Sequence, residues 1–585
     1  MRNLLFSGLI CCVAACASTP GWADDDLNAI IQDYEALQLE ISPNAQARVN
    51  ETLPSTWTDL SQERDAATLS TLESLSDRLS KINDSALSED EALNLAILKT
   101  IIEDQITLAR FDENRVPFTG DSGFGQHIVF ALSNIRIQNE ADAVATIERL
   151  KGIPDFLDMN VANMRRGLET GFVSYKDPLD TVMIQMKEQI VDDPEQSDLY
   201  SAFESLPASI SEARQAELRA EAKEAIRAAI SGFEKTVAFF ETEYAPNTRE
   251  KPGVMDLTDG RDYYRAVLAM HTTRPDLTPE EVHEIGQSEV ERIRAEMDAI
   301  IEEVGFEGSF SEFLEFLRTD EQFYPKTAED LMEKAARLSK DIDAEMPAFF
   351  KTLPRLSYGV EPVPAAIAPG YTTGRYVQGD PDKGEAGTYW VNTYALDQRP
   401  LYELPALTAH EAVPGHHHQI ALSQELENVP QFRREYYATA FGEGWGLYSE
   451  YLGREMGLYD TPYERFGQLS MEMWRACRLV ADTGMHWYGW SREEGEACFV
   501  ENSALAPLNI KTEVTRYIGW PGQATAYKMG ELTIKSLRKE AETAMGADFD
   551  LREFHDVVLE KGALPLEVLE MRVRDWIADQ QASDE

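Results

Sequence analysis

The chain has 585 residues, of which 43% are hydrophobic, so it can bury a substantial core in two or three domains or in one large helical enzyme. Its formal net charge of −49 argues against nucleic acid as a partner, because no basic excess exists to neutralise phosphates. Acidity of this degree favours solubility but leaves the fold and the oligomeric state open.

The first residues, MRNLLFSGLICCVAACASTPGWADDD, predict an export signal. Arg2 precedes an apolar run over residues 4–15, which is too short to cross a membrane. Two processing sites remain open: an ordinary signal peptide of residues 1–23, or a lipoprotein signal of residues 1–15 that leaves Cys16 lipidated after the lipobox-like VAAC. Both predict an exported, periplasmic protein, and the second adds a lipid anchor in the outer membrane.

Two helical regions follow, over residues 24–250 and 251–585, and the second carries the candidate metal site. In the first region, SEDEALNLAILKTIIEDQITLARF places apolar residues at helical spacing. In the second, Thr278 and the glutamate three residues later form a capping box, which predicts a helix that ends near Gly305. The prediction is a mainly α protein in which the first region is scaffold.

Residues 353–400 interrupt the helices with a segment rich in proline, glycine and aromatic residues. This composition predicts loops around short strands, and GTYWVNT at residues 387–393 is the best strand candidate. Such a strand would bind an extended peptide by strand addition, with Asn392 adding a side-chain contact. We therefore expect a small β element directly before the histidine-rich helix.

The segment LTAHEAVPGHHHQ, at residues 407–419, holds four of the nine histidines of the chain. In the usual zinc-protease motif, His-Glu-x-x-His, two histidines four residues apart share one helical face and bind one metal ion. Here His410 and Glu411 are in place, but Pro414 occupies the position of the second histidine. Because proline interrupts a helix and Gly415 permits a sharp turn, we expect a break at this point.

The break leaves the identity of the second histidine ligand open. On a regular helix His417 would share the face of His410, but roughly 10 Å further along the axis, which is too far for one zinc ion. A turn at Pro-Gly can instead bring His416 back to the metal. We favour His416, keep His417 as the alternative, and regard His418 as the weakest candidate.

A third ligand is expected from YYATAFGEGWGLYSEYLG, in which Glu443 lies between two glycines. Each glycine costs a helix about 1 kcal/mol, a cost that is reasonable where a helix must approach another backbone closely. Glu450 lies two turns later on the same face, and we expect it to support the site rather than to bind the metal. Two histidines and a carboxylate suit one zinc ion with a fourth position left for water.

HEAVPGHH, GEGWGLYSEYLG, DTGMHWYGWSREE and RYIGWPGQATAYKMGEL together resemble the bacterial domain-of-unknown-function family 885. That family in turn resembles helical zinc peptidases whose third ligand is a glutamate, such as carboxypeptidase Taq and the thimet-type oligopeptidases. The resemblance implies a large helical clamshell in which His410, a histidine after Pro-Gly and Glu443 hold zinc. It also implies that Glu411 is the general base.

A peptidase also needs a hydrogen-bond donor for the oxyanion, and the candidates lie in the C-terminal third. His486 follows Asp482 by one helical turn, so the aspartate could orient it, or the two could equally form a structural pair. Tyr517 and Tyr527 flank the interruption IGWPGQATA and line the cleft or belong to the core, and Arg516 is a further donor or a group that binds a substrate carboxylate.

The sequence therefore predicts an exported zinc-dependent peptidase that hydrolyses short peptides. The alternatives are a non-catalytic lipoprotein of the same fold that binds peptide or metal, and a zinc amidohydrolase that acts on non-peptide amides. Cleavage from an end or internally stays open. Cys477 and Cys498, the two cysteines beyond the leader, either pair in an oxidising compartment or remain buried thiols.

Overall fold

The computed structural model describes residues 25–119, 122–133, 135–365, 367–368 and 371–583. Within these ranges the chain is mainly α-helical and contains one three-stranded sheet, which confirms the predicted fold class. The predicted leader and Cys16 lie outside the described residues. No helix in the described ranges is both long and apolar enough to cross a membrane.

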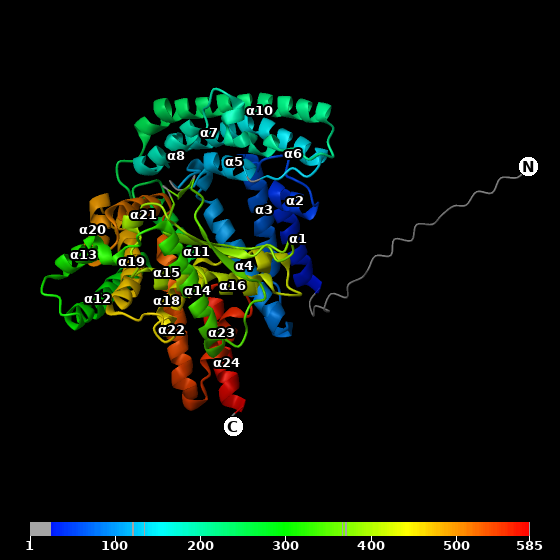
Figure 1. The fold of residues 1–585 in the computed structure, drawn as a ribbon. Helices are drawn as coiled ribbons and strands as arrows, with labels where there is room; N and C mark the ends of the chain where they lie inside the picture. Colours follow the sequence, from blue (N-terminus) through cyan, green and yellow to red (C-terminus); the bar gives the residue numbers. More distant parts are fainter. Residues whose placement is uncertain (1–24, 120–121, 134, 366, 369–370, 584–585) are drawn as a thin grey trace, which may run out of the picture.

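The first helices of the chain pack against its last helices, although several hundred residues separate them (Figure 1). Leu98 and Ile102 share one hydrophobic core with Trp445, Leu537 and Leu569. The helices that build this core are α1 (Asp25–Ile41), α3 (Gln62–Leu79), α4 (Glu89–Ala109), α18 (Thr439–Leu452), α22 (Ala526–Met545), α23 (Leu551–Leu559) and α24 (Leu566–Ser583), with the short α2 (Pro43–Val49) beside α1.

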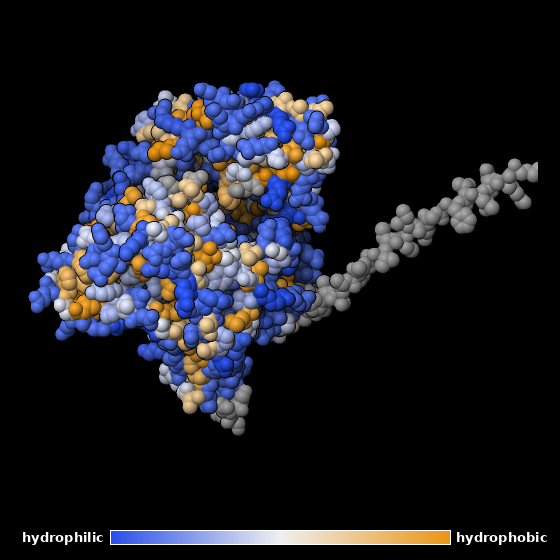
Figure 2. Space-filling model, in the orientation of Figure 1, coloured by the Kyte–Doolittle hydropathy of each residue, from blue (hydrophilic) through white to orange (hydrophobic). Residues whose placement is uncertain are grey.

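A second group of helices, at the top of Figure 1, has a core of its own that runs from Phe118 to Tyr244. Its members are α5 (Phe124–Ser133), α6 (Glu140–Lys151), α7 (Ile153–Thr170), α8 (Lys176–Glu188), α9 (Ser201–Glu204) and α10 (Glu212–Phe239). Figure 2 shows that the surface is hollowed between this layer and the body beneath it. The first predicted region thus contributes to more than one core, and the core that α1, α3 and α4 share continues into the C-terminal region.

The third group surrounds α19 (Pro462–His486), which packs along α12 (Pro279–Glu303). The capping box at Thr278 starts α12 as predicted, and Gly305 follows its end with a positive φ of 66°. A disulfide joins Cys477 of α19 to Cys498, so the two cysteines pair. The remaining helices here are α11 (Gly260–Thr272), α13 (Phe310–Thr319), α14 (Ala328–Phe349), α20 (Arg492–Asn502) and α21 (Pro507–Gly519).

The sheet consists of β1 (Tyr358–Pro362), β2 (Gly374–Val377) and β3 (Gly387–Val391) in the order β1-β3-β2. The strand expected at residues 387–393 is therefore present as β3, but the prediction that it binds peptide by strand addition is wrong. It is the central strand, so its backbone already pairs on both sides. Asn392 is fully buried, and its amide nitrogen donates to the carbonyl groups of the preceding loop instead of facing a substrate.

Four helices follow the sheet directly and carry the histidine motif through the centre of the molecule (Figure 1). They are α15 (Leu404–Glu411), α16 (His416–Gln424), α17 (Gln431–Glu435) and α18. Because α15 lies against both β2 and α18, the sheet and the glycine-containing helix meet at the motif.

Candidate metal centre

The chain turns sharply between α15 and α16, where the sequence places Pro414 and Gly415. The N–H of Gly415 donates to the carbonyl oxygen of Ala409 over 3.0 Å. A Cβ on residue 415 would lie 1.9 Å from the carbonyl oxygen of His410, so no residue with a side chain fits there without moving the backbone. The turn starts α16 at His416 and returns that side chain towards His410.

His410, His416 and Glu443 converge so that their candidate donor atoms lie within 4.8 Å of one another. The Oε2 atom of Glu443 lies 3.5 Å from Nε2 of His410 and 3.4 Å from Nε2 of His416. The two imidazole rings stand almost perpendicular, with 4.8 Å between their centroids. Two imidazoles and one carboxylate are a donor set of catalytic zinc sites that keep one position open, so the residues fit this ion.

The negative charge gathered around His410 also suits a cation. Burial raises the pKa of Glu443, but His416 and His410 outweigh burial and hold the pKa well below its usual value. Burial lowers the pKa of His410, but the carboxylates of Glu443 and Glu450 outweigh it and raise the pKa to about 9. In the absence of metal, the positive charge of His410 and the negative charge of Glu443 therefore stabilise each other, and a metal cation would replace that proton.

Glu450 orients His410, as expected of a supporting residue. Its Oε1 atom lies 2.8 Å from Nδ1 of His410, and the carboxylate is fully buried. Nη2 of Arg475 lies 3.3 Å from the same oxygen and compensates the buried charge. A proton held at Nδ1 by a carboxylate leaves Nε2 of His410 free to bind a metal.

The glycines of α18 allow the close approach that the sequence predicts. A Cβ on residue 446 would lie 2.7 to 3.0 Å from three ring atoms of His410. A Cβ on residue 444 would lie 2.5 Å from the backbone of Gly530 on α22. Gly446 therefore makes room for the ring of His410, while Gly444 lets α18 pack against the neighbouring helix.

Glu411 lies next to the ligands and is held by the sheet. The backbone N–H of Tyr376 on β2 donates to Oε2 of Glu411 over 2.8 Å. The residue is only 8% exposed. Since one oxygen is fixed by the strand, the carboxylate is oriented while its Oε1 atom can accept a proton.

His417 and His418 do not join the site. The hydroxyl of Tyr376 lies 3.0 Å from Nδ1 of His417, and the carbonyl oxygen of Leu356 lies 3.1 Å from Nε2. Both ring nitrogens are thus engaged, which argues against His417 as the second ligand. His418 is fully buried against Phe350, with 4.6 Å between the ring centroids, and belongs to the core.

The prediction that His486 donates to an oxyanion is wrong. His486 is fully buried, its Nδ1 accepts the N–H of Val254, and its Nε2 lies 3.0 Å from the carbonyl oxygen of Tyr517. Asp482 does not orient it, because this carboxylate accepts hydrogen bonds from the hydroxyl of Tyr264 and from a backbone N–H. The pair that shares a helical face in the sequence is therefore split between two internal networks.

Tyr517 and Arg516 are also committed to the interior, so their predicted contacts with substrate are not supported. Glu513 accepts hydrogen bonds from the Tyr517 hydroxyl over 2.7 Å and from Nη2 of Arg516 over 3.0 Å. The same hydroxyl accepts the Trp474 indole N–H and the Nε–H of Arg478. Glu513 is thus buried and is the common hydrogen-bond acceptor for Arg478, Arg516 and Tyr517.

Tyr527 is the residue of the C-terminal third that remains beside the metal centre. Burial raises the pKa of its phenol, and the next contribution comes from the carboxylate of Glu443. Arg478 lies over its ring, 4.2 Å from the centroid. Arg478 thus holds the ring in place, and the charge of the candidate ligand Glu443 acts on the phenol.

Two residues that the sequence did not single out also face this region. Tyr437 is 43% exposed, and its hydroxyl lies against Gly442, where a Cβ would be 2.2 Å from the oxygen. Burial of its hydroxyl and then the charge of Glu443 raise the pKa of Tyr437 well above its usual value. Arg375 is exposed on β2, directly before the residue that binds Glu411. The sequence signal that could have identified Arg375 is a single basic residue in GYTTGRYV, a segment rich in glycine and aromatic residues at 370–377.

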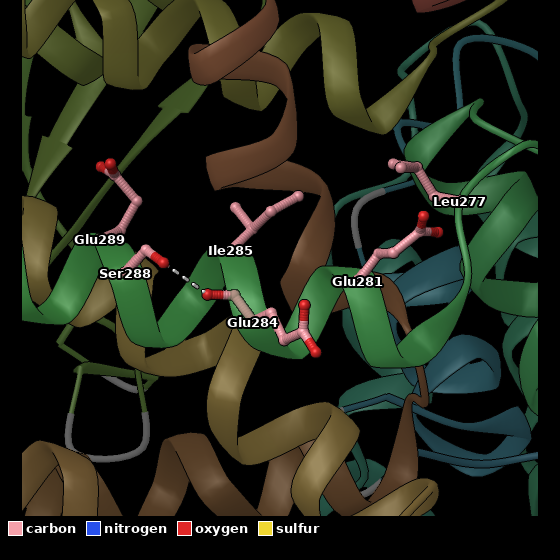
Figure 3. Close-up of a pocket in the computed structure, with 6 residues that line it drawn as sticks. All are labelled: Leu277, Glu281, Glu284, Ile285, Ser288 and Glu289. Carbon is pink, nitrogen blue, oxygen red and sulfur yellow. Dashed lines mark hydrogen bonds between the residues drawn. The ribbon is translucent and has the colours of Figure 1, made fainter.

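A groove of about 420 Å³ along α12 is separate from these residues (Figure 3). Three glutamates line it, but two have structural partners. Glu281 closes the capping box with Thr278, and Glu289 pairs with Lys528 and Arg292. Carboxylates engaged in this way stabilise the ends and packing of α12, and the groove contains no histidine that would suggest zinc.

Comparison with known proteins agrees with this architecture. The structure described as "the putative lipoprotein from Colwellia psychrerythraea" is 27% identical, with a TM-score of 0.85 over 95% of this chain and 99% of that one. A "putative lipoprotein of unknown function" from Shewanella oneidensis shares the fold at 17% identity, with a TM-score of 0.70 over 93% and 98% of the two chains. No curated protein matches the sequence. A family model described as bacterial protein of unknown function (DUF885) matches residues 43–573, and the chain belongs to this family.

Proposed function

We propose that this protein is a zinc-dependent peptidase that hydrolyses short peptides. The observation that carries the proposal is the convergence of His410, His416 and Glu443 beside a carboxylate, Glu411, that a neighbouring strand orients. A zinc ion bound there would lower the pKa of a water molecule towards neutrality and polarise the carbonyl group to be attacked.

The side chains around the site have distinct roles in this reaction. Glu411 takes the proton of the attacking water and returns it to the leaving amine. The hydroxyls of Tyr527 and Tyr437 are the available donors for the oxyanion, because both phenols stay protonated near neutral pH. Glu450 keeps His410 in the tautomer and orientation that binding requires.

A non-catalytic protein that binds metal would need His410, His416 and Glu443, but it would not need Glu411. A protein that only stores or senses metal has no need for a carboxylate beside the first ligand, held by a hydrogen bond from a strand. A zinc amidohydrolase acting on non-peptide amides would use the same residues, and the choice of substrates in the assay separates it from a peptidase.

We further propose that the protein is exported and anchored by a lipid at Cys16. The disulfide between Cys477 and Cys498 suits an oxidising compartment. The two similar structures carry the description of lipoproteins, which favours the lipobox over ordinary signal cleavage. An outer-membrane anchor that faces the periplasm is consistent with both observations.

The experiment that tests the activity compares the parent with Glu411→Gln on a mixture of short peptides followed by mass spectrometry. Loss of the general base is expected to lower kcat by about 10²- to 10⁴-fold while zinc stays bound. Glu427→Gln, which changes an exposed carboxylate in the segment after α16, is the control and should keep full activity. A zinc-loaded parent that cleaves no peptide, or a Glu411→Gln variant as active as the parent, would contradict the proposal.

A further inference from the structure

Arg375 occupies an unusual position, because its backbone is directly bonded to the amide that orients Glu411. In β2, Gly374 and Tyr376 are buried while Arg375 between them is exposed, as expected of side chains that alternate across a strand. The peptide nitrogen of Tyr376 lies 2.8 Å from the Glu411 carboxylate. The guanidinium therefore projects from the strand that borders the reaction site.

The charge of Arg375 is not neutralised by an ion pair. The chain has 103 acidic and 54 basic residues, so carboxylates are abundant. The other arginines close to the site pair with them: Arg475 with Glu450, and Arg478 and Arg516 with Glu513. Among the described residues, by contrast, no carboxylate lies within 4 Å of the Arg375 guanidinium.

Two phenols and one carboxylate act on the charge of Arg375. Burial lowers the pKa of its guanidinium, but Tyr371, Glu411 and Tyr527 outweigh burial and raise the pKa. Burial and the charge of Glu443 raise the pKa of Tyr437, and the charge of Arg375 lowers it. An exposed guanidinium without an ion pair presents its hydrogen-bond donors to a ligand, so this side of the site suits an anionic group.

A carboxylate is the anion that a peptide supplies, and the geometry indicates which one. A guanidinium binds a carboxylate through two parallel hydrogen bonds. The carbonyl group that reacts must lie beside Glu411, and each residue of an extended peptide spans about 3.5 Å. Because Arg375 is adjacent to the residue that holds Glu411, its guanidinium can reach a carboxylate one or two residues beyond the bond that is cleaved.

We propose that Arg375 binds the free carboxyl end of the substrate, so that the protein removes one or two residues from the C-terminus of a peptide. This inference rests on the proposed peptidase function and specifies its substrate class. It replaces the predicted role of Arg516, whose charge Glu513 already compensates.

Binding is measured first, with zinc-loaded Glu411→Gln, in which turnover is slow, and acetyl-tetra-alanine as the probe. Calorimetry compares the free acid with the C-terminal amide. The free acid is expected to bind about 10- to 100-fold more tightly, because a hydrogen-bonded charge pair is lost in the amide. Adding Arg375→Ala should abolish this difference, whereas adding Arg337→Ala, on an exposed face of α14, should preserve it.

A third probe, the amide with aspartate as its last residue, separates the two sources of a carboxylate. If it binds as tightly as the free acid, Arg375 reads acidic side chains and the assignment to the chain terminus is wrong. Hydrolysis gives an independent readout: Arg375→Ala should raise KM for the free acid by at least about 10-fold and leave the amide unchanged. Zinc content confirms that each variant keeps the site intact.

The two proposals fail in different ways. If the parent hydrolyses acid and amide equally well and Arg375→Ala changes neither, the inference about Arg375 is wrong while the peptidase function stands. If no peptide is hydrolysed, the peptidase proposal is wrong. A preference of the Glu411→Gln protein for the free acid that depends on Arg375 would still establish the carboxylate site.

Discussion

Glu450 determines how His410 is presented to a metal. The carboxylate has no exposed surface, and its charge is stabilised by the imidazole on one side and by Arg475 on the other. Burying a charge is costly unless it is paired and hydrogen-bonded, so this arrangement is expected only where it has a use. Fixing the tautomer of a ligand is such a use.

Replacing Glu450 with glutamine should lower the affinity for zinc by about 10- to 100-fold, because the amide orients the ring but no longer raises its basicity. Competition with a chromogenic chelator measures the affinity. Glu427→Gln, on the surface, should bind zinc as the parent does. Unchanged affinity in Glu450→Gln would show that the contact with His410 is only structural.

The close packing of α18 against α15 is the feature of the helices on which the site depends. Gly446 faces the ring of His410 at a distance that leaves no space for a methyl group. Gly530 of α22 allows close packing on the opposite side of α18, since a Cβ there would lie 1.8 Å from the carbonyl oxygen of Ala440. Gly446 therefore sets the distance between the helices that carry His410 and Glu443, while Gly530 sets that between α18 and α22.

Gly446→Ala should displace the His410 ring and reduce bound zinc to less than about one tenth of the parent value, with a loss of stability of about 1 to 3 kcal/mol from overpacking. Elemental analysis and thermal unfolding measure the two effects. Gly359→Ala on β1 is the matched control, because no atom lies within 4 Å of the added Cβ. Full zinc occupancy in Gly446→Ala would mean that the ring is not confined by α18.

The convergence of the three candidate ligands could be predicted because each depends on a local pattern. The scarcity of histidine, the Pro-Gly break and a glutamate between glycines are visible within a few residues of sequence. The choice between His416 and His417 could not be made, because it depends on the path of a turn. Arg375 was missed since its position follows from the contact of Tyr376 with Glu411, 35 residues away.

The wrong predictions have a common physical cause. His486 and Tyr517 were chosen as polar residues near an interrupted helix, but a sequence does not show burial. Both are fully buried and serve hydrogen-bond networks that hold α19 and α21 together. Similarly, the strand at residues 387–393 was recognised from its composition, but its central place in the sheet depends on pairing with two distant segments.

Segments that are far apart in the sequence pack against one another in the molecule as a whole. The helices α1, α3 and α4 share a core with its last helices, and Val413 and Trp445, close in sequence to the candidate ligands, belong to the same core. The disulfide between Cys477 and Cys498 adds a covalent link over 21 residues in the group around α19. This link can be removed without touching the metal ligands.

Reduction of the disulfide should destabilise the protein by about 3 kcal/mol, because a loop of this length loses that much constraint in the unfolded state. Urea unfolding with and without dithiothreitol measures the change, and zinc content should stay the same. The double variant with Cys477→Ala and Cys498→Ala serves as the control, since reductant should have no further effect on it. An identical midpoint for oxidised and reduced parent protein would contradict the expectation.

The zinc site is best tested by measuring metal content by elemental mass spectrometry on mature protein purified without a histidine tag. We expect about one zinc ion per chain in the parent, loss of that ion in His410→Ala and His416→Ala, and full retention in His417→Ala. A parent that stays free of metal after zinc is supplied, or a His417→Ala variant that loses zinc while His416→Ala keeps it, would contradict the site described here.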